Sequence, residues 1–339
     1  MRYVRARAFA GFVLFAAAFG LTANAQENRF FRIGTGGTAG TYFPIGGLIA
    51  HSISAPPGSR ACDDGGACGV ENLVAVAMAT DGSISNLHDV QSGRLDAALT
   101  QTDVAFWGYS GTGMFSGKPA SPDLRAIAYL YPEAVHVVVR KDSGIRSIPD
   151  LKGKRVSLDE TGSGTVADAR LILGAFDLSE KDVQAEYLKP PAAGEKLAAG
   201  ELDAFFFVGG TPVEAIQELA RTTPIDLVPI SGATAEQRLT RYSFFSWDAI
   251  PAGTYPGIDS RLTTISVGAV LVTHAGQSED LIYGITKALW NGNTRKLLDE
   301  GHAKGKLIRP ENALKGLAIP LHPGAERFYR EAGLLPQAP

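Results

Sequence analysis

The sequence lacks the local motifs that usually mark a catalytic centre. It contains no Gly-x-Ser-x-Gly turn, no His-Glu-x-x-His pair and no P-loop lysine after its glycine-rich stretches. No two carboxylates stand in surroundings that would tune one as an acid and the other as a base. The six histidines are scattered along the chain, at His51, His88, His136, His274, His302 and His322. These absences argue against an enzyme and favour a protein that binds its ligand without chemistry.

Long apolar runs are missing from the sequence after the first 25 residues. No later stretch reaches the 18 or so apolar residues of a membrane helix. The run AFAGFVLFAAAFGL has 14 residues and follows a segment with three arginines. Ala-Asn-Ala at 23–25 then supplies a small-x-small cleavage pattern. We therefore predict that residues 1–25 are a secretory signal peptide cleaved before Gln26, and that no membrane span or lipid anchor remains.

An excess of basic charge is also missing. Cleavage would remove three arginines and no acid, which leaves 29 basic and 35 acidic residues and a net charge of about −6. Nucleic acid is bound through a basic surface. The charge therefore argues against a nucleic-acid partner.

Cysteine is scarce, with Cys62 and Cys68 as the sole pair, in ACDDGGACG. In the oxidising compartment that export implies, so close a pair favours a disulfide. The alternative is a metal site of two thiolates with Asp63 and Asp64, but no histidine stands nearby. We predict that the disulfide closes a surface loop, and we expect neither a metal nor a cofactor.

The stretch RIGTGGTAGTYFP, residues 32–44, fits the dinucleotide fingerprint at Gly34, Gly36 and Ala39. The fingerprint needs an acidic residue about 20 positions later, where this chain has SAPPGSRA. The physics beneath the motif still applies: glycine lets a ligand approach the backbone, and the first amides of a helix favour an anion. We interpret the stretch as a ligand-binding turn between a strand and a helix.

Several patterns occur twice in the chain. KRVSLDETGSGTVADARLILGAF (154–176) repeats the order of strand, Thr/Gly/Ser turn and helix. SGRLDAALTQTDVAF (92–106) resembles AGELDAFFFVGGTPVEA (199–215), in which Thr211 is expected to cap a helix and Asp203, like Asp96, to form a turn. AVHVVVRK (134–141) corresponds to ISVGAVLVTH (265–274). The duplication predicts two α/β lobes, 26–132 plus 262–339 and 133–261, with a ligand cleft at their strand ends.

Taken in order, these segments resemble the TAXI group of solute-binding subunits of tripartite ATP-independent periplasmic (TRAP) transporters. The resemblance covers residues 29 to 330. It is carried by GTGGTAGTYFPIGGLIA, SGRLDAALTQTDVAF, LYPEAVHVVVRKDSGIRSIPDLKGKRVSL, TGSGT, GELDAFFFVGGTP, IPAGTYPG and IPLHPGAERFY. It implies a type II-like periplasmic binding protein fold that captures a small organic acid, such as glutamate, a dicarboxylate or a keto acid. The solute would pass to a membrane permease of the TRAP type.

The resemblance also implies a set of ligand-binding residues. In the first lobe they are Gly37, Thr38, Tyr42, Ser85, Asn86, Gln101 and Asp103, with Tyr131 at the hinge. In the second lobe they are Thr161, Ser163, Gly164, Thr165, Gly209 and Thr211.

Two features depart from the family pattern. Residues 54–87 are longer than expected, hold both cysteines and offer two Asn-Leu segments, at Asn72 and Asn86; the spacing favours the second. The second departure is the segment ETGSGT, residues 160–165, because a proline or small residue is expected before Gly-Ser-Gly-Thr. Glu160 in this segment would repel an anion if it pointed inward. Two alternatives stay open: a receptor for an ATP-driven importer or sensor kinase, and an exported two-lobe enzyme.

Overall fold

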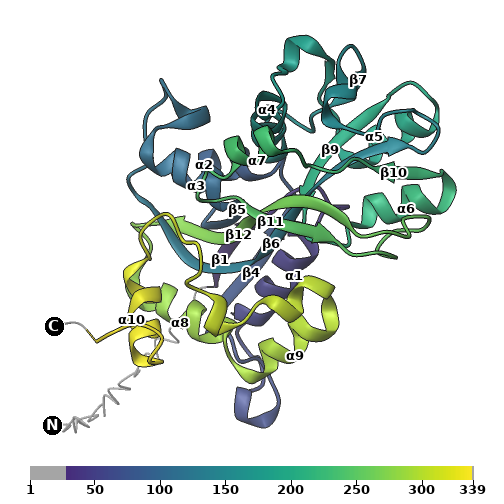
Figure 1. The fold of residues 1–339 in the computed structure, drawn as a ribbon. Helices are drawn as coiled ribbons and strands as arrows, with labels where there is room; N and C mark the ends of the chain where they lie inside the picture. The colour runs from purple at the N-terminus through teal and green to yellow at the C-terminus, as the bar shows by residue number, and fades with distance from the viewer. Residues whose placement is uncertain (1–27, 338–339) are drawn as a thin grey trace, which may run out of the picture.

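The computed structural model describes residues 28–337, so the predicted signal peptide lies outside the described residues. A ten-stranded mixed sheet continues through both lobes (Figure 1), in the order β4-β1-β5-β12-β6-β9-β7-β8, with β10 paired to β6 and β11 paired to β12. The strands are β1 (Arg29–Gly34), β4 (Leu73–Met78), β5 (Ala97–Gln101), β6 (Leu124–Arg140), β7 (Arg155–Ser157), β8 (Gln184–Glu186), β9 (Ala204–Gly209), β10 (Ile225–Leu227), β11 (Ser246–Ile250) and β12 (Leu262–His274).

The strand pairing repeats from one lobe to the other. In lobe I, β4, β1 and β5 are parallel and β12 pairs antiparallel with β5. In lobe II, β8, β7 and β9 are parallel and β6 pairs antiparallel with β9. The long strands β6 and β12 pair with each other between the lobes. The α/β fold with two lobes is therefore confirmed, and so is the equivalence of the duplicated segments.

Helices follow the parallel strands in the same order in both lobes. Lobe I has α1 (Tyr42–Ile53), α2 (Ser83–Gln91) and α3 (Thr102–Ser110), and lobe II has α4 (Thr165–Ala175), α5 (Pro190–Ala198), α6 (Glu214–Thr222) and α7 (Ala233–Leu239). Parallel strands need such crossovers, because a short turn cannot return the chain to the same end of the sheet.

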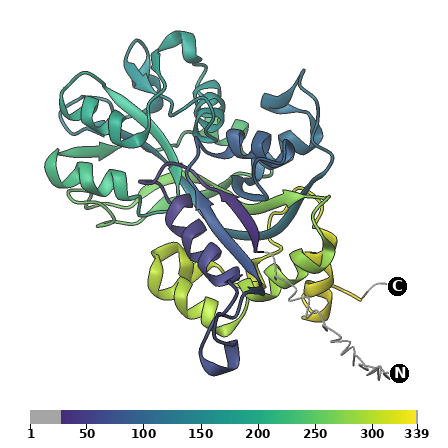
Figure 2. The same ribbon diagram turned by 180° about the vertical axis from the view of Figure 1, so that it is seen from behind.

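The C-terminal segment packs on lobe I (Figure 2). It contains α8 (Glu279–Leu289), α9 (Gly292–Gly301) and α10 (Pro323–Glu331). Ile45 and Ile49 of α1 share one buried apolar cluster with Ile282 and Ile285 of α8 and with Tyr329 of α10. Burial of such side chains contributes about 1.5–3 kcal/mol each. β6 runs unbroken through residue 133, and the lobe limits 26–132, 133–261 and 262–339 stay a prediction.

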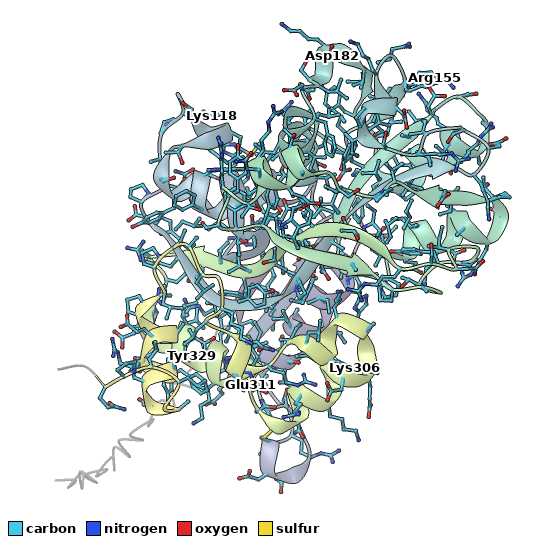
Figure 3. All side chains as sticks on the ribbon, in the orientation of Figure 1. Lys118, Arg155, Asp182, Lys306, Glu311 and Tyr329 are labelled. Atoms are coloured by element: carbon cyan, nitrogen blue, oxygen red, sulfur yellow. A yellow bond between two sulfur atoms is a disulfide. The ribbon has the colours of Figure 1, made fainter. Side chains whose placement is uncertain are left out.

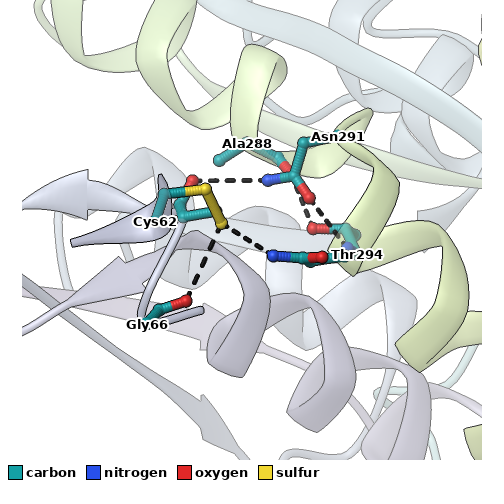
Figure 4. Close-up of a disulfide and its surroundings, with 7 residues drawn as sticks. Cys62, Gly66, Ala288, Asn291 and Thr294 are labelled. Atoms are coloured by element: carbon teal, nitrogen blue, oxygen red, sulfur yellow. Dashed lines mark hydrogen bonds between the residues drawn. A yellow bond between two sulfur atoms is a disulfide. The ribbon is translucent and has the colours of Figure 1, made fainter. Parts of the chain in front are cut away.

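The Cys62–Cys68 disulfide is present and closes a surface loop (Figure 4), as predicted. The loop leaves the small sheet of β2 (Ser54–Ala55) and β3 (Val70–Glu71). Asn291 and Asn293 at the start of α9 donate to Cys68, through its carbonyl oxygen at 3.3 Å and its sulfur at 2.9 Å. The hydrogen bonds to Cys68 therefore connect the disulfide loop to the C-terminal part of lobe I.

One local expectation is wrong, and another is incomplete. Thr211 does not cap α6, which begins at Glu214, because the Val213 amide donates to the Tyr255 hydroxyl at 3.0 Å instead of starting a helix. Asp96 and Asp203 do more than form turns. The Asp203 carboxylate accepts hydrogen bonds from the backbone and side-chain nitrogens of Arg155. Asp96 does the same for Arg32.

Membrane-spanning length is not reached by any helix between residues 28 and 337.

Candidate ligand-binding site

A cavity lies between the lobes, at the carboxyl ends of their parallel strands. Its volume is about 120 Å³, where one water needs roughly 10–15 Å³. It therefore accommodates a metabolite-sized solute rather than a polymer. Lobe I contributes residues 36–42, 81–83 and Gln101; lobe II contributes Asp159, Glu160, 163–165, 189–191, Phe207 and Val208; and Glu133 comes from the shared strand β6.

The first residues of four helices line this cavity: Tyr42 of α1, Ser83 of α2, Thr165 of α4 and Pro190 of α5. Within residues 28–337, the backbone amides of Tyr42 and Phe43, and those of Gly164 and Thr165, donate to no protein acceptor. Unpaired amides at a helix start carry partial positive charge and favour an anion. Tyr42, Gly164 and Thr165 line the cavity, so each lobe brings such donors to it.

The lobes touch each other around the cavity. The Thr41 hydroxyl of lobe I donates to the Gly210 carbonyl oxygen of lobe II at 3.0 Å. The amides of Ile84 and Ser85 donate to the Gly162 carbonyl oxygen, each at 3.0 Å. Gly164 packs so closely on Gln101 that an added Cβ would lie 1.4 Å from its Oε1. The structure therefore shows the lobes in a closed arrangement.

A buried hydrogen bond forms part of the cavity wall. The Tyr42 hydroxyl donates to Glu133 Oε2 at 2.6 Å and lies 3.5 Å from the Ser83 hydroxyl. Burial is the main cause that raises the pKa of Glu133 to about 8, against the opposing effect of the Tyr42 bond. At neutral pH this carboxyl group is therefore mostly protonated, and it can donate a hydrogen bond to a solute.

Other carboxyl groups lie where lobe II meets the cavity. Burial raises the pKa of Asp159 to about 7 and also raises that of Glu160. Lys189 lies 3.5 Å from Glu160 and 3.8 Å from Asp81 of lobe I. Glu160 thus faces the cleft, and Lys189 compensates its charge.

Half of the residues predicted for the site line the cavity, and half do not. Those at the cavity are Gly37, Thr38, Tyr42, Gln101, Ser163, Gly164 and Thr165. Those that the structure does not bring there are Ser85, Asn86, Asp103, Tyr131, Thr161, Gly209 and Thr211.

The second group has structural positions instead. The Asn86 amide group donates to the carbonyl oxygens of Thr35 and Leu99, so it links the residue after β1 to the middle of β5. Tyr131 is fully buried in the lobe I core. Asp103 is buried below Gln101, against lobe II.

Sequence reasoning missed Asp81, Ser83, Glu133 and Lys189 as residues lining the cavity. Two signals were available. A carboxylate inside the apolar run LYPEAVHVVV needs a polar partner or a special environment. Lys189 directly precedes the two prolines that begin α5. In the duplicated order, α5 of lobe II corresponds to α2 of lobe I, which begins at Ser83.

Comparison with known proteins finds several similar structures and one matching family. A structure from Bordetella bronchiseptica RB50 is similar, with a TM-score of 0.51 and 17% identity over 88% of this chain and 82% of that one. The alkanesulfonate-binding protein SsuA from Xanthomonas axonopodis pv. citri, bound to MOPS, has a TM-score of 0.48 and 18% identity, over 90% of this chain and 84% of that one. An ancestral arginine-binding protein bound to arginine has a TM-score of 0.47 and 16% identity, over 82% of this chain and 100% of that one. Residues 33–333 match the model of the NMT1-like family. Because the match spans most of the sequence, the chain belongs to the NMT1-like family.

Proposed function

We propose that the protein is a periplasmic solute receptor of the TAXI type, which captures a small organic acid between its lobes and delivers it to a TRAP membrane permease. One observation carries the capture step: residues with unpaired amides at the starts of α1 and α4 line one cavity from opposite lobes. A carboxylate that accepts from both sets favours the closed arrangement by its differential affinity.

The carboxyl groups of the cavity are compatible with such a solute. Glu133 and Asp159 have raised pKa values of about 8 and about 7. Protonated, they donate hydrogen bonds instead of repelling an anion, and Lys189 supplies a positive charge. Delivery to a TRAP permease rests on the sequence resemblance. An ATP-driven importer or a sensor kinase is the alternative partner.

Mass spectrometry of the solute that copurifies with the exported protein tests this function, followed by calorimetric titration with glutamate, a dicarboxylate and a keto acid. We expect one carboxylate to bind, and we expect mass analysis after incubation to show it unchanged. Binding of a sugar or an uncharged solute with no heat from any carboxylate contradicts the proposal. Copurification with an ATPase subunit instead of a multispan permease supports the alternative.

A further inference from the structure

Two buried carboxyl groups from opposite lobes meet behind the cavity. Asp103 lies in the first turn of α3 in lobe I, and Asp168 lies in the first turn of α4 in lobe II. Both residues are completely buried, and their carboxyl groups are within hydrogen-bonding reach of each other. The Gln101 side-chain amide donates to Asp168 Oδ2 at 2.9 Å. The contact exists because the lobes are closed.

No positive charge compensates this pair. Among residues 28–337, no lysine, arginine or histidine pairs with either side chain, and the one group of donors at Asp103 is the backbone amides of Asp103 and Val104. In the same part of the chain, Oδ1 of Asp168 has no hydrogen-bond donor. A third carboxyl group, Glu133 of β6, acts on the same site, and it faces Tyr42 of α1 and Lys304 in turn. Two adjacent buried carboxylates cannot both stay ionised.

One proton resolves the conflict. A protonated Asp168 donates through Oδ1 to an Asp103 oxygen and still accepts from Gln101 through Oδ2. When the lobes part, water reaches both groups and each carboxyl ionises separately. The helix starts of α3 and α4 then favour the two negative charges. The proton comes from solvent on closing and returns to it on opening, and no covalent bond changes.

We propose that Asp103 and Asp168 form a proton-binding site between the lobes, so that closure takes up one proton. This inference rests on the proposed two-lobe receptor and adds a pH dependence to its closure. The sign follows from linkage: the proton is bound more tightly in the closed form, so closure is favoured at low pH. That advantage is lost as the pH rises through the pKa of the closed pair. Burial and the neighbouring carboxyl raise the pKa of Asp168 well above its ordinary value.

Fluorescence energy transfer between the lobes tests the proposal without a solute. Dyes are attached to cysteines introduced by Lys118→Cys on lobe I and Lys181→Cys, beside Asp182 on lobe II (Figure 3). Both lysines are exposed, and the two native cysteines are held in a disulfide, so labelling is specific. The closed-to-open ratio is then measured from pH 5 to pH 9. We expect it to fall by up to about tenfold per pH unit as the pH rises toward the pKa of the closed pair, and to become constant above that pKa.

Asp168→Asn is the informative variant, because an amide replaces the protonated carboxyl: its NH₂ group donates to Asp103 and its oxygen accepts from Gln101. We expect its closed-to-open ratio to be independent of pH. Asp259→Asn, at an exposed position, serves as the control and should follow the wild type. A wild-type ratio that is equal at pH 5 and pH 9, or an Asp168→Asn profile that matches the wild type, overturns the proposal.

These results are separate from the receptor test. Lobes that respond to pH in a protein that binds no carboxylate in calorimetry would contradict the receptor function and leave the proton site standing. A protein that binds a carboxylate but closes equally at every pH would contradict the proton site and support the receptor function.

Discussion

The hydroxyl of Tyr42 on α1 donates a hydrogen bond of 2.6 Å to Glu133 on β6, inside the wall of the cavity. Tyr42→Phe leaves a buried acceptor without its donor, which costs about 1–3 kcal/mol. We expect the free energy of unfolding in urea to fall by that amount. Tyr283→Phe is the matched control, because its hydroxyl also donates to a carboxylate, Glu331, at 2.6 Å but at an exposed site. Equal losses in the two variants would contradict the prediction.

Glu133 also makes stability depend on pH. Its pKa is about 8 in the folded protein, above the ordinary value near 4.5, so the folded state holds the proton more tightly. Stability from this group is fully present below about pH 4.5 and is lost as the pH rises toward 8, by at most about 1.4 kcal/mol per pH unit. We expect Glu133→Gln to remove this part of the pH dependence in urea melts. Glu311→Gln, at an exposed position, should leave the profile as in the wild type.

Gly164 is expected to control closure. An added Cβ would lie 1.4 Å from Gln101 Oε1 across the lobe contact, while its φ of −74° suits alanine. Overpacking of this kind costs about 1–3 kcal/mol, so Gly164→Ala should lower the closed-to-open ratio about fivefold or more and leave each lobe folded. Gly174→Ala, in the same helix with nothing within 4 Å of the new Cβ, is the control. X-ray scattering gives the measurement; unchanged dimensions with Gly164→Ala would contradict the expectation.

The disulfide is expected to stabilise the chain without taking part in binding. Cys62 and Cys68 are six residues apart, and a loop of that length is worth about 2 kcal/mol in the chain-entropy account. A double Cys→Ser variant should lose about that much stability in urea, while its affinity for the copurified solute stays the same. A large loss of affinity would mean that the inserted loop supports the cavity.

Thr165 and Gln101 test the cavity directly. The Thr165 hydroxyl accepts a hydrogen bond from the Val208 amide at 3.1 Å, and Gln101 contacts Asp168 across the lobes. We expect Thr165→Ala and Gln101→Ala each to weaken solute binding, by about 0.5–1.5 kcal/mol for one hydrogen bond, with the fold retained. Calorimetry with the identified solute measures the loss. Unchanged affinity in both variants would mean that the solute binds elsewhere.

Much of the fold follows from local pattern, because each lobe is built from consecutive strands and helices whose periodicity and turns are visible in the sequence. The duplicated Gly-x-Leu-Asp-Ala segments and the turns at 36–42 and 161–165 led to the two lobes and to one wall of the cavity from each. The features that the sequence did not predict depend on distant partners. The Val213 amide donates to Tyr255, and the Asn86 side chain donates to the carbonyl oxygens of Thr35 and Leu99. Such contacts form between segments that are far apart in the sequence, so local sequence patterns do not predict them.

The carbonyl oxygen of Gly162 accepts the amides of Ile84 and Ser85 at the start of α2. One lobe thereby completes the first turn of a helix that belongs to the other. When the lobes separate, water has to take over both donors, so the hydrogen exchange of these two amides reports directly on how often the protein opens.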